Sequence, residues 1–287
     1  MTFNVDQLIG YQLAEFAQCS QRRVHLLAAQ STIAAAAIAS VYFEGPKASY
    51  LMGFMGLVLV IAWFVLLLRY RGSRDVAERA RRATLIMGGL GQTISSSELI
   101  DIQNSFTIKD EAARQRFDPD YFASKSAPGF DRLAEMLEES SFWTKELQAG
   151  SARYMGAFAA LLFLLSIFLV FAAIMFVDGP HLMQIVRVAF VILTTTVFSS
   201  VLDTAMAHYR TANAVARIHH RLEVAKSKGN PKADLLLLLS DYNAVVESAP
   251  LNLPYVYASR KEKFNRLWQQ RQALDNPPQN PEEQSTA

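Results

Sequence analysis

Long uninterrupted apolar runs dominate the hydrophobic pattern of this chain. Four of them stand out, at residues 24–43, 50–68, 155–177 and 186–202, and the last is the shortest and most polar. A bilayer core of roughly 30 Å needs about 20 helical residues, and backbone groups in lipid must be satisfied within the helix. The pattern therefore predicts four transmembrane helices.

Short turns rich in glycine and proline join these spans in pairs. Residues 44–49 separate the first two spans, and a turn that contains residues 178–181 separates the last two. Helices joined by such short turns run antiparallel to each other. We therefore expect an all-α membrane protein with four transmembrane helices in two antiparallel hairpins, together with a helical cytoplasmic module.

The basic residues predict the orientation. Arg22 and Arg23 precede the first span, six arginines follow the second, and the turn between carries only Lys47. The six arginines are Arg69, Arg71, Arg74, Arg79, Arg81 and Arg82. The second pair of spans has the same asymmetry, so the positive-inside rule puts both termini in the cytoplasm. The arginine cluster is also a candidate for contact with anionic lipid headgroups, although it can simply enforce topology.

The remaining segments complete the expected organisation. It consists of an N-terminal cytoplasmic helix (1–23), hairpin 1 (24–68), a helical module (69–154), hairpin 2 (155–202), a cytoplasmic stalk with helices (203–274) and a disordered tail (275–287). The N-terminal segment has apolar residues at helical spacing, which suits either an interfacial helix or an ordinary packed one. No small-residue cleavage site precedes the first apolar run, so we do not expect a cleaved signal peptide.

Local signals place the helix ends. We expect the second span to continue to about residue 87 and to stop at Gly88 and Gly89. Ser95, followed three residues later by Glu98, is typical of a helix start. A helix that begins near Pro128 should lead straight into the third span, and the fourth span should continue as a stalk to about residue 228. Two further helices are expected at about 231–250 and 258–274, with an extended segment at 251–255.

Composition narrows the chemistry. The net charge of +2 gives no reason to expect a nucleic acid polymer as partner, and the single Cys19 excludes an internal disulfide. We find no phosphate-binding glycine loop, nucleophile elbow or zinc motif, so we expect no enzyme activity and no cofactor. The adjacent His219 and His220 point about 100° apart on a helix, and His208 is about three turns away, so no metal site is expected.

Polar residues within the spans are the candidates for a pore lining. Thr196, Ser200 and Asp203 recur at helical spacing in and after the fourth span, and Gln30 lies about one turn into the first. Ionisable and polar groups at this depth usually face protein or water. Packing between helices explains the same residues, because small hydroxyl side chains commonly form hydrogen bonds between transmembrane helices. Both interpretations remain open at this point.

The layout and three short segments resemble those of the SLATT-type membrane effectors of bacterial nucleotide-signalling and anti-phage systems. These segments are residues 121–124 (Tyr-Phe-Ala-Ser), 139–143 (Glu-Ser-Ser-Phe-Trp) and 253–255 (Leu-Pro-Tyr). The resemblance implies a bacterial inner-membrane effector that forms a homo-oligomeric pore, or disrupts the membrane, in response to a nucleotide second messenger or a cytoplasmic sensor protein. It transfers no catalytic or gating residue to this chain.

Two other functions remain open. One is a non-conducting anchor or sensor that recruits cytoplasmic partners, for which Tyr255 is the candidate contact residue. The other is a constitutive small-ion channel with hairpins like those of bestrophins, although no filter motif or broken span is present. The lipid bilayer is an expected partner under all three functions.

Overall fold

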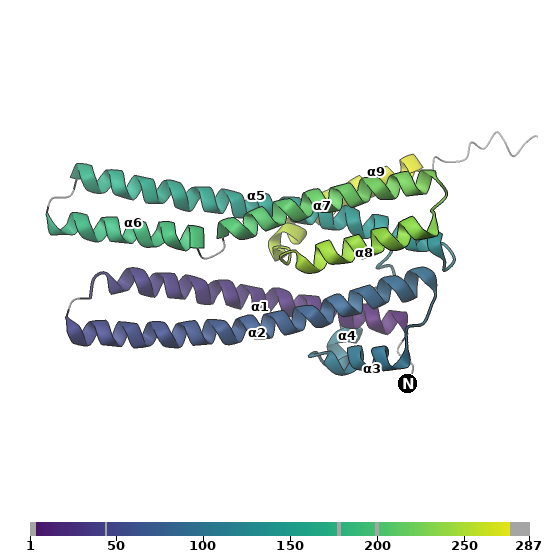
Figure 1. Ribbon diagram of the computed structural model, residues 1–287, viewed down its shortest axis with the longest axis horizontal. Coiled ribbons are helices and arrows are strands. Elements are labelled where there is room, and N and C mark those ends of the chain that lie inside the picture. The colour runs from purple at the N-terminus through teal and green to yellow at the C-terminus, as the bar shows by residue number, and fades with distance from the viewer. Residues whose placement is uncertain (1–3, 44, 177–178, 199–200, 276–287) are drawn as a thin grey trace, which may run out of the picture.

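The computed structural model describes residues 4–43, 45–176, 179–198 and 201–275, and every regular element in these ranges is a helix (Figure 1). In chain order the helices are α1 (Val5–Ser40), α2 (Pro46–Leu90), α3 (Ser96–Ser105), α4 (Asp110–Arg116), α5 (Phe130–Phe176), α6 (Pro180–Phe198), α7 (Val201–Ser227), α8 (Lys232–Ser248) and α9 (Pro254–Asp275). The all-α class predicted from the sequence is confirmed.

The molecule is elongated and has two unlike halves. Figure 1 shows the α1–α2 and α5–α6 hairpins alone at one end, whereas α3, α4, α7, α8 and α9 gather at the other end. Within the hairpins, α1 packs on α2 and α6 packs on α5. We call these two parts the hairpin half and the bundle half.

Two helices are long and apolar enough to cross a membrane, judged by length and composition in the part of the chain described. They are α2 and α5, whose most apolar stretches have mean hydropathies of 2.7 and 2.9. The apolar stretch of α6 is shorter, His181–Leu193, and polar residues such as Gln30, Ser31 and Thr32 dilute that of α1. Two such helices are compatible with a membrane protein, and the four-span topology stays a prediction.

Both long helices pass from one half into the other without a break. The predicted continuation of the second span is confirmed by α2, and α5 confirms the predicted run into the third span. The stop predicted at Gly88 and Gly89 is wrong. Instead, α2 ends at Leu90, with Gly91 in the left-handed region at φ 67° and its N–H donating to Met87 O at 3.1 Å.

Other boundaries also differ from expectation. The last helix begins at Pro254 rather than near residue 258, because proline has no N–H to lose in the first turn of a helix. Only residues 251–253 of the predicted extended segment are therefore non-helical. The fourth span and the stalk correspond to α6 and α7, and the predicted continuation between them falls on residues 199–200, which lie outside the described residues. The predicted disordered tail lies outside them as well, apart from Asp275 at the end of α9.

Three apolar clusters hold the bundle half together. The largest joins α2, α5, α7 and α8 through buried residues such as Leu85, Leu133, Val215 and Leu235. A second cluster seats the N-terminal half of α1, with Leu8 fully buried beside Ala80, Ala83, Met87 and Ile102. This burial decides between the two alternatives for the N-terminal segment, which is a packed helix of the bundle rather than an interfacial one.

Polar contacts fix the ends and crossings of these helices. The Asn4 side chain accepts from the N–H of Gln7 at 2.8 Å and the Gln7 side chain accepts from that of Asn4, which forms a capping box at the start of α1. Ser95 accepts from the N–H of Glu98 at 3.3 Å, as the sequence predicted. The buried carboxylate of Glu15 accepts from the backbone N–H of Thr107 at 3.1 Å, and this ties the loop before α4 to α1.

A glycine explains why α2 does not stop at residue 88. A Cβ at Gly89 would lie 2.9 Å from Leu133 Cδ1 and 3.0 Å from Leu133 Cα, so only glycine allows α2 and α5 to approach this closely. Gly129, just before α5, donates its N–H to the Gly89 carbonyl at 2.8 Å. The crossing of the two long helices depends on this contact.

Replacing Gly89 therefore tests the fold. We expect Gly89→Ala to lower the free energy of unfolding by about 1–3 kcal/mol, because the added methyl group overpacks the crossing. Gly72→Ala, in the same helix but with nothing within 4 Å of the added Cβ, should raise it by up to about 1 kcal/mol. Thermal unfolding followed by circular dichroism in detergent compares the two. Equal stability of both variants would show that the close crossing is not needed.

Candidate functional site

A cavity of about 470 Å³ lies where the hairpin half meets the bundle half. Its walls come from α1, α2, α5, α7 and the end of α8, so the two hairpins and the bundle all contribute to it. The charged residues of its wall are Arg23, Arg71, Arg74, Asp75, Glu78 and Glu247. We call it the junction cavity. It is the candidate functional site because it combines buried charge with the boundary between the two halves.

Arg23 is the most unusual residue of this wall. Only 7% of it is exposed, and its Nη2 lies 3.4 Å from Nε2 of the fully buried His208. Because a guanidinium can only donate, His208 Nε2 accepts and its Nδ1–H donates to the Gln148 side-chain oxygen. Gln148 in turn donates to the Pro250 carbonyl at 3.0 Å. This chain of hydrogen bonds joins α1, α7, α5 and the segment after α8.

The electrostatics around these hydrogen bonds agree with a neutral His208. Burial, together with the positive charges of Arg23 and Arg74, lowers the pKa of His208 to about 3. Burial also lowers the pKa of Arg23. Arg23 Nη1 has no hydrogen-bond partner among the described residues, although it is buried. A buried guanidinium nitrogen without a partner is costly and calls for an anion or water.

The opposite part of the wall is compensated from within the protein. Glu78 is buried and lies 3.0 Å from Arg81 and 3.8 Å from Arg74, measured between side-chain nitrogen and oxygen. Burial raises the pKa of Glu78, and the two arginines oppose that shift. Arg74 also donates to the carbonyls of Val246 and Glu247, both at 3.1 Å, at the C-terminal end of α8. This end of α8 therefore docks on α2.

The six arginines of the predicted basic cluster fall into two groups, exposed ones and ones paired within the bundle half. Arg69 and Arg71 are exposed at the boundary between the two halves. Further along α2, Arg79 pairs with Glu98 at 3.4 Å, and Arg82 pairs with Glu247 at 3.0 Å. Together with Arg74 and Arg81, these arginines have partners inside the bundle half, which sequence alone did not indicate. Contact of the cluster with lipid headgroups stays a prediction.

Two of the four predicted pore-lining residues, Gln30 and Asp203, have side chains that the structure describes. Gln30 is half-buried and lines the junction cavity. Asp203 is exposed near the start of α7, whereas its neighbours Val201 and Thr204 line the cavity. Ser200 lies outside the described residues, and so does the side chain of Thr196. The pore lining stays a prediction.

Tyr255, the predicted partner-contact residue, lies at the start of α9. It is exposed, and its ring packs edge-on against that of Tyr154 with centroids 5.1 Å apart. Its neighbours Leu253 and Val256 are buried against Met155 of α5 and Ala205 of α7, so this segment seats α9 on the bundle. Burial also raises the pKa of the Tyr255 hydroxyl. Contact with a partner protein stays a prediction.

Sequence reasoning missed the ionic contact between α9 and the bundle. Arg271 donates to Glu138 at 3.0 Å from Nη2 and 3.1 Å from Nε, and its Nη2 also bonds Glu223 at 2.5 Å. Glu138 is buried on α5, and Glu223 lies on α7. The isolated sequence gave no pairing signal because these three residues are far apart along the chain. The contact holds α9 across both helices.

A serine and a histidine beside this contact are structural. Ser141 Oγ donates to the Glu138 carbonyl at 2.8 Å, and His219 Nδ1 lies 2.7 Å from Ser141 Oγ. Because the hydroxyl proton goes to the carbonyl, the histidine donates to Ser141 rather than removing its proton. Ser141 has no exposed surface, so no substrate can reach its oxygen. The pair joins α5 to α7.

No cluster of three or more histidine, cysteine or acidic side chains is placed to hold a metal ion within the part of the chain that the structure describes. His208 and His219 instead belong to the two separate hydrogen-bond networks above. Comparison of the chain with known protein families, curated proteins and solved structures finds no match. The function must therefore be argued from the geometry of the junction cavity and of the two halves.

The buried His208 makes stability depend on pH. Its pKa is about 3 in the folded chain and about 6.5 in the unfolded chain. Below about pH 6.5 the unfolded chain therefore binds a proton at this histidine, whereas the folded chain does not. We expect stability to fall between pH 6.5 and 3, by at most about 1.4 kcal/mol per pH unit from this residue. The dependence should be weaker in His208→Gln than in the wild type.

Thermal unfolding in detergent, measured at several pH values between 7 and 4, gives the slopes of the wild type and of His208→Gln. Identical slopes for the two chains would contradict a buried, neutral His208.

Proposed function

We propose that this chain is a four-span protein of a bacterial inner membrane, with the hairpin half in the bilayer and the bundle half in the cytoplasm. The most apolar stretch of α2 has no residue buried within the protein, which is the exposure expected of a helix that faces lipid. The arginines at the bundle side of both hairpins support this orientation, with both termini cytoplasmic. The α1 and α6 helices supply the two further spans.

The order of helices across the hairpin half carries the functional proposal. In Figure 1, α1 and α6 lie between α2 and α5, and α1 contacts α6. The two inner helices correspond to the more polar spans of the sequence, and the two outer ones are the most apolar. This arrangement suits a polar path between the hairpins with lipid outside, as in channels lined by small polar side chains.

We infer that the chain is a pore-forming or membrane-disrupting effector that acts as a homo-oligomer. Four helices with so few charges do not enclose a wide aqueous path alone, and exposed polar residues of α1 such as Ser31 gain partners or water in a ring of chains. Because α2 and α5 are continuous through both halves, a displacement of the bundle moves the spans. The trigger, by resemblance to SLATT-type effectors, is a nucleotide second messenger or a cytoplasmic sensor protein in anti-phage defence.

One observation favours a non-conducting anchor instead. The exposed Thr32 hydroxyl donates to the Ala28 carbonyl of its own helix at 3.0 Å, which lets this polar side chain face lipid without water. Under this second function the bundle half recruits cytoplasmic partners and the spans only hold it at the membrane. A constitutive channel would differ from both in conducting without a trigger.

The topology is tested by labelling single cysteines in a Cys19→Ser background. Lys47→Cys and His181→Cys, at the two hairpin turns, should react with an impermeant maleimide added outside intact cells whose outer membrane is permeabilised. Arg221→Cys, in the bundle half, should react only after lysis. Labelling of residue 221 in intact cells, or protection of both turns, would rule out this orientation.

The pore is tested with a triple variant, Thr196→Val with Ser200→Ala and Asp203→Leu. If these residues line a pore, the variant should abolish the membrane depolarisation that the triggered wild type causes, read with a potential-sensitive dye. Ser166→Ala is the matched control, because among the described residues the Ser166 hydroxyl bonds only the Leu162 carbonyl of its own helix, α5. Unchanged depolarisation in the triple variant would leave the pore lining without support. Absence of depolarisation in the triggered wild type would favour the anchor.

A further inference from the structure

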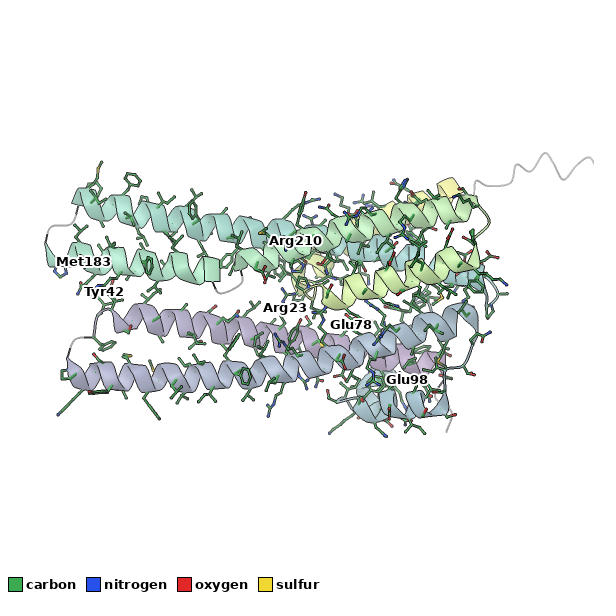
Figure 2. The ribbon with its side chains drawn as sticks, in the orientation of Figure 1. Arg23, Tyr42, Glu78, Glu98, Met183 and Arg210 are labelled. Carbon is green, nitrogen blue, oxygen red and sulfur yellow. The ribbon has the colours of Figure 1, made fainter. Side chains whose placement is uncertain are left out.

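The junction cavity has a charged side and an apolar side. Along α1 and α2 the charged residues of its wall lie nearer the bundle half than the apolar Leu26, Leu27 and Leu67. Met155 and Val201 add to the apolar part, and Gln30, Tyr70 and Thr204 also line the cavity. Figure 2 shows Arg23 and Glu78 where the α1–α2 pair meets α7 and α8, at the inner end of the hairpins. A ligand that matches this cavity therefore needs an anionic group joined to an apolar part. Its volume of about 470 Å³ is in the range of small-molecule sites.

Two arginines of the charged side remain available for such a ligand. Glu78 is compensated by Arg81 and Arg74, and Glu247 by Arg82. Arg71 is exposed and forms no ion pair or hydrogen bond within the described residues, and Arg23 has the buried, unpartnered Nη1. Asp75 is the remaining acidic residue of the wall and is itself exposed to solvent.

The neighbouring arginine is held differently. Arg22 donates to the Arg69 carbonyl at 2.9 Å and to the Thr107 hydroxyl at 3.5 Å. Arg23 instead enters the protein, where His208 orients its guanidinium through Nη2. This orientation is set before any ligand binds, which lowers the entropy cost of binding at Nη1.

We infer that the junction cavity binds an anionic phospholipid, with its phosphate at Arg23 and Arg71 and its acyl chains along Leu27 and Leu67. Guanidinium groups match phosphate oxygens in charge and geometry, and basic pockets between membrane helices on the cytoplasmic side suit lipid headgroups. A free phosphate would use the arginines alone and leave the apolar side unfilled. The two-sided wall therefore favours the lipid as the source of the phosphate.

The bound lipid bridges the two hairpins. Arg23 and Leu27 lie on α1, Arg71 and Leu67 on α2, while Met155 of α5 and Val201 of α7 close the other side. Binding therefore stabilises one spacing between the hairpins, and release permits another. This regulatory role rests on the proposed membrane placement and function, whereas binding itself is measurable without any leak.

The test measures lipid retained by the full-length chain. Protein purified in detergent with phosphatidylglycerol, or with phosphatidylcholine of the same acyl chains, is examined by native mass spectrometry. We expect one phosphatidylglycerol per chain and little phosphatidylcholine. Arg71→Gln and Arg23→Gln should each weaken retention by more than about tenfold, beyond the roughly fivefold effect of one surface charge.

Arg69→Gln is the matched control, because Arg69 is exposed on the same helix two residues from Arg71 but does not line the cavity. Equal losses in Arg69→Gln and Arg71→Gln would overturn the site in favour of surface attraction, and this pair remains decisive if Arg23→Gln fails to fold. Equal retention of both lipids would overturn it as well. If excess inorganic phosphate displaces the phosphatidylglycerol and the site shows no preference for the lipid, the site would be assigned to a free phosphate instead.

These outcomes are separate from those of the proposed function. A chain that retains phosphatidylglycerol but never depolarises cells supports the lipid site and counts against the pore. A chain that depolarises cells when triggered but retains no phosphatidylglycerol overturns the lipid site alone.

Discussion

The structure depends on one constraint, namely that long apolar helices must leave water while the charged segments joined to them stay in it. The helices α2 and α5 meet this constraint by being apolar in one half and amphipathic in the other, without a break between. Their crossing at Gly89 and Leu133 joins the two long helices within the bundle half. Most of the other described helices pack on one of these two, whereas α4 packs on α1.

The same constraint explains the polar chemistry at the junction. Under the proposed membrane placement, polar side chains lose access to water where the apolar part of each helix begins, and they need partners within the protein. Arg23, His208 and Gln148 form one series of hydrogen bonds there, which leaves Arg23 Nη1 without a partner among the described residues, and Glu78 is paired with arginines of its own helix. The junction cavity lies between these groups, so its charge is a consequence of the boundary itself.

The bundle half adds a second layer of organisation. The contact of Arg271 with Glu138 and Glu223 holds α9 across α5 and α7, and Arg74 holds the end of α8 on α2. A ligand or protein that displaced α8 or α9 would therefore act directly on the two continuous helices. Under the proposed function, this is the physical route by which a cytoplasmic trigger reaches the spans.

The sequence by itself determined the helical class, the pairing into hairpins and most helix ends, because hydrophobic run length, glycine, proline and capping residues act locally. It placed the helix start at Ser95 correctly. It misplaced the end of α2, because the glycines at 88 and 89 serve a contact with a helix more than forty residues away. Only the tertiary structure decided which arginines are paired internally and that Arg23 is buried beside His208. These contacts join residues far apart in the chain, and no local pattern encodes which of several basic residues a distant carboxylate will reach.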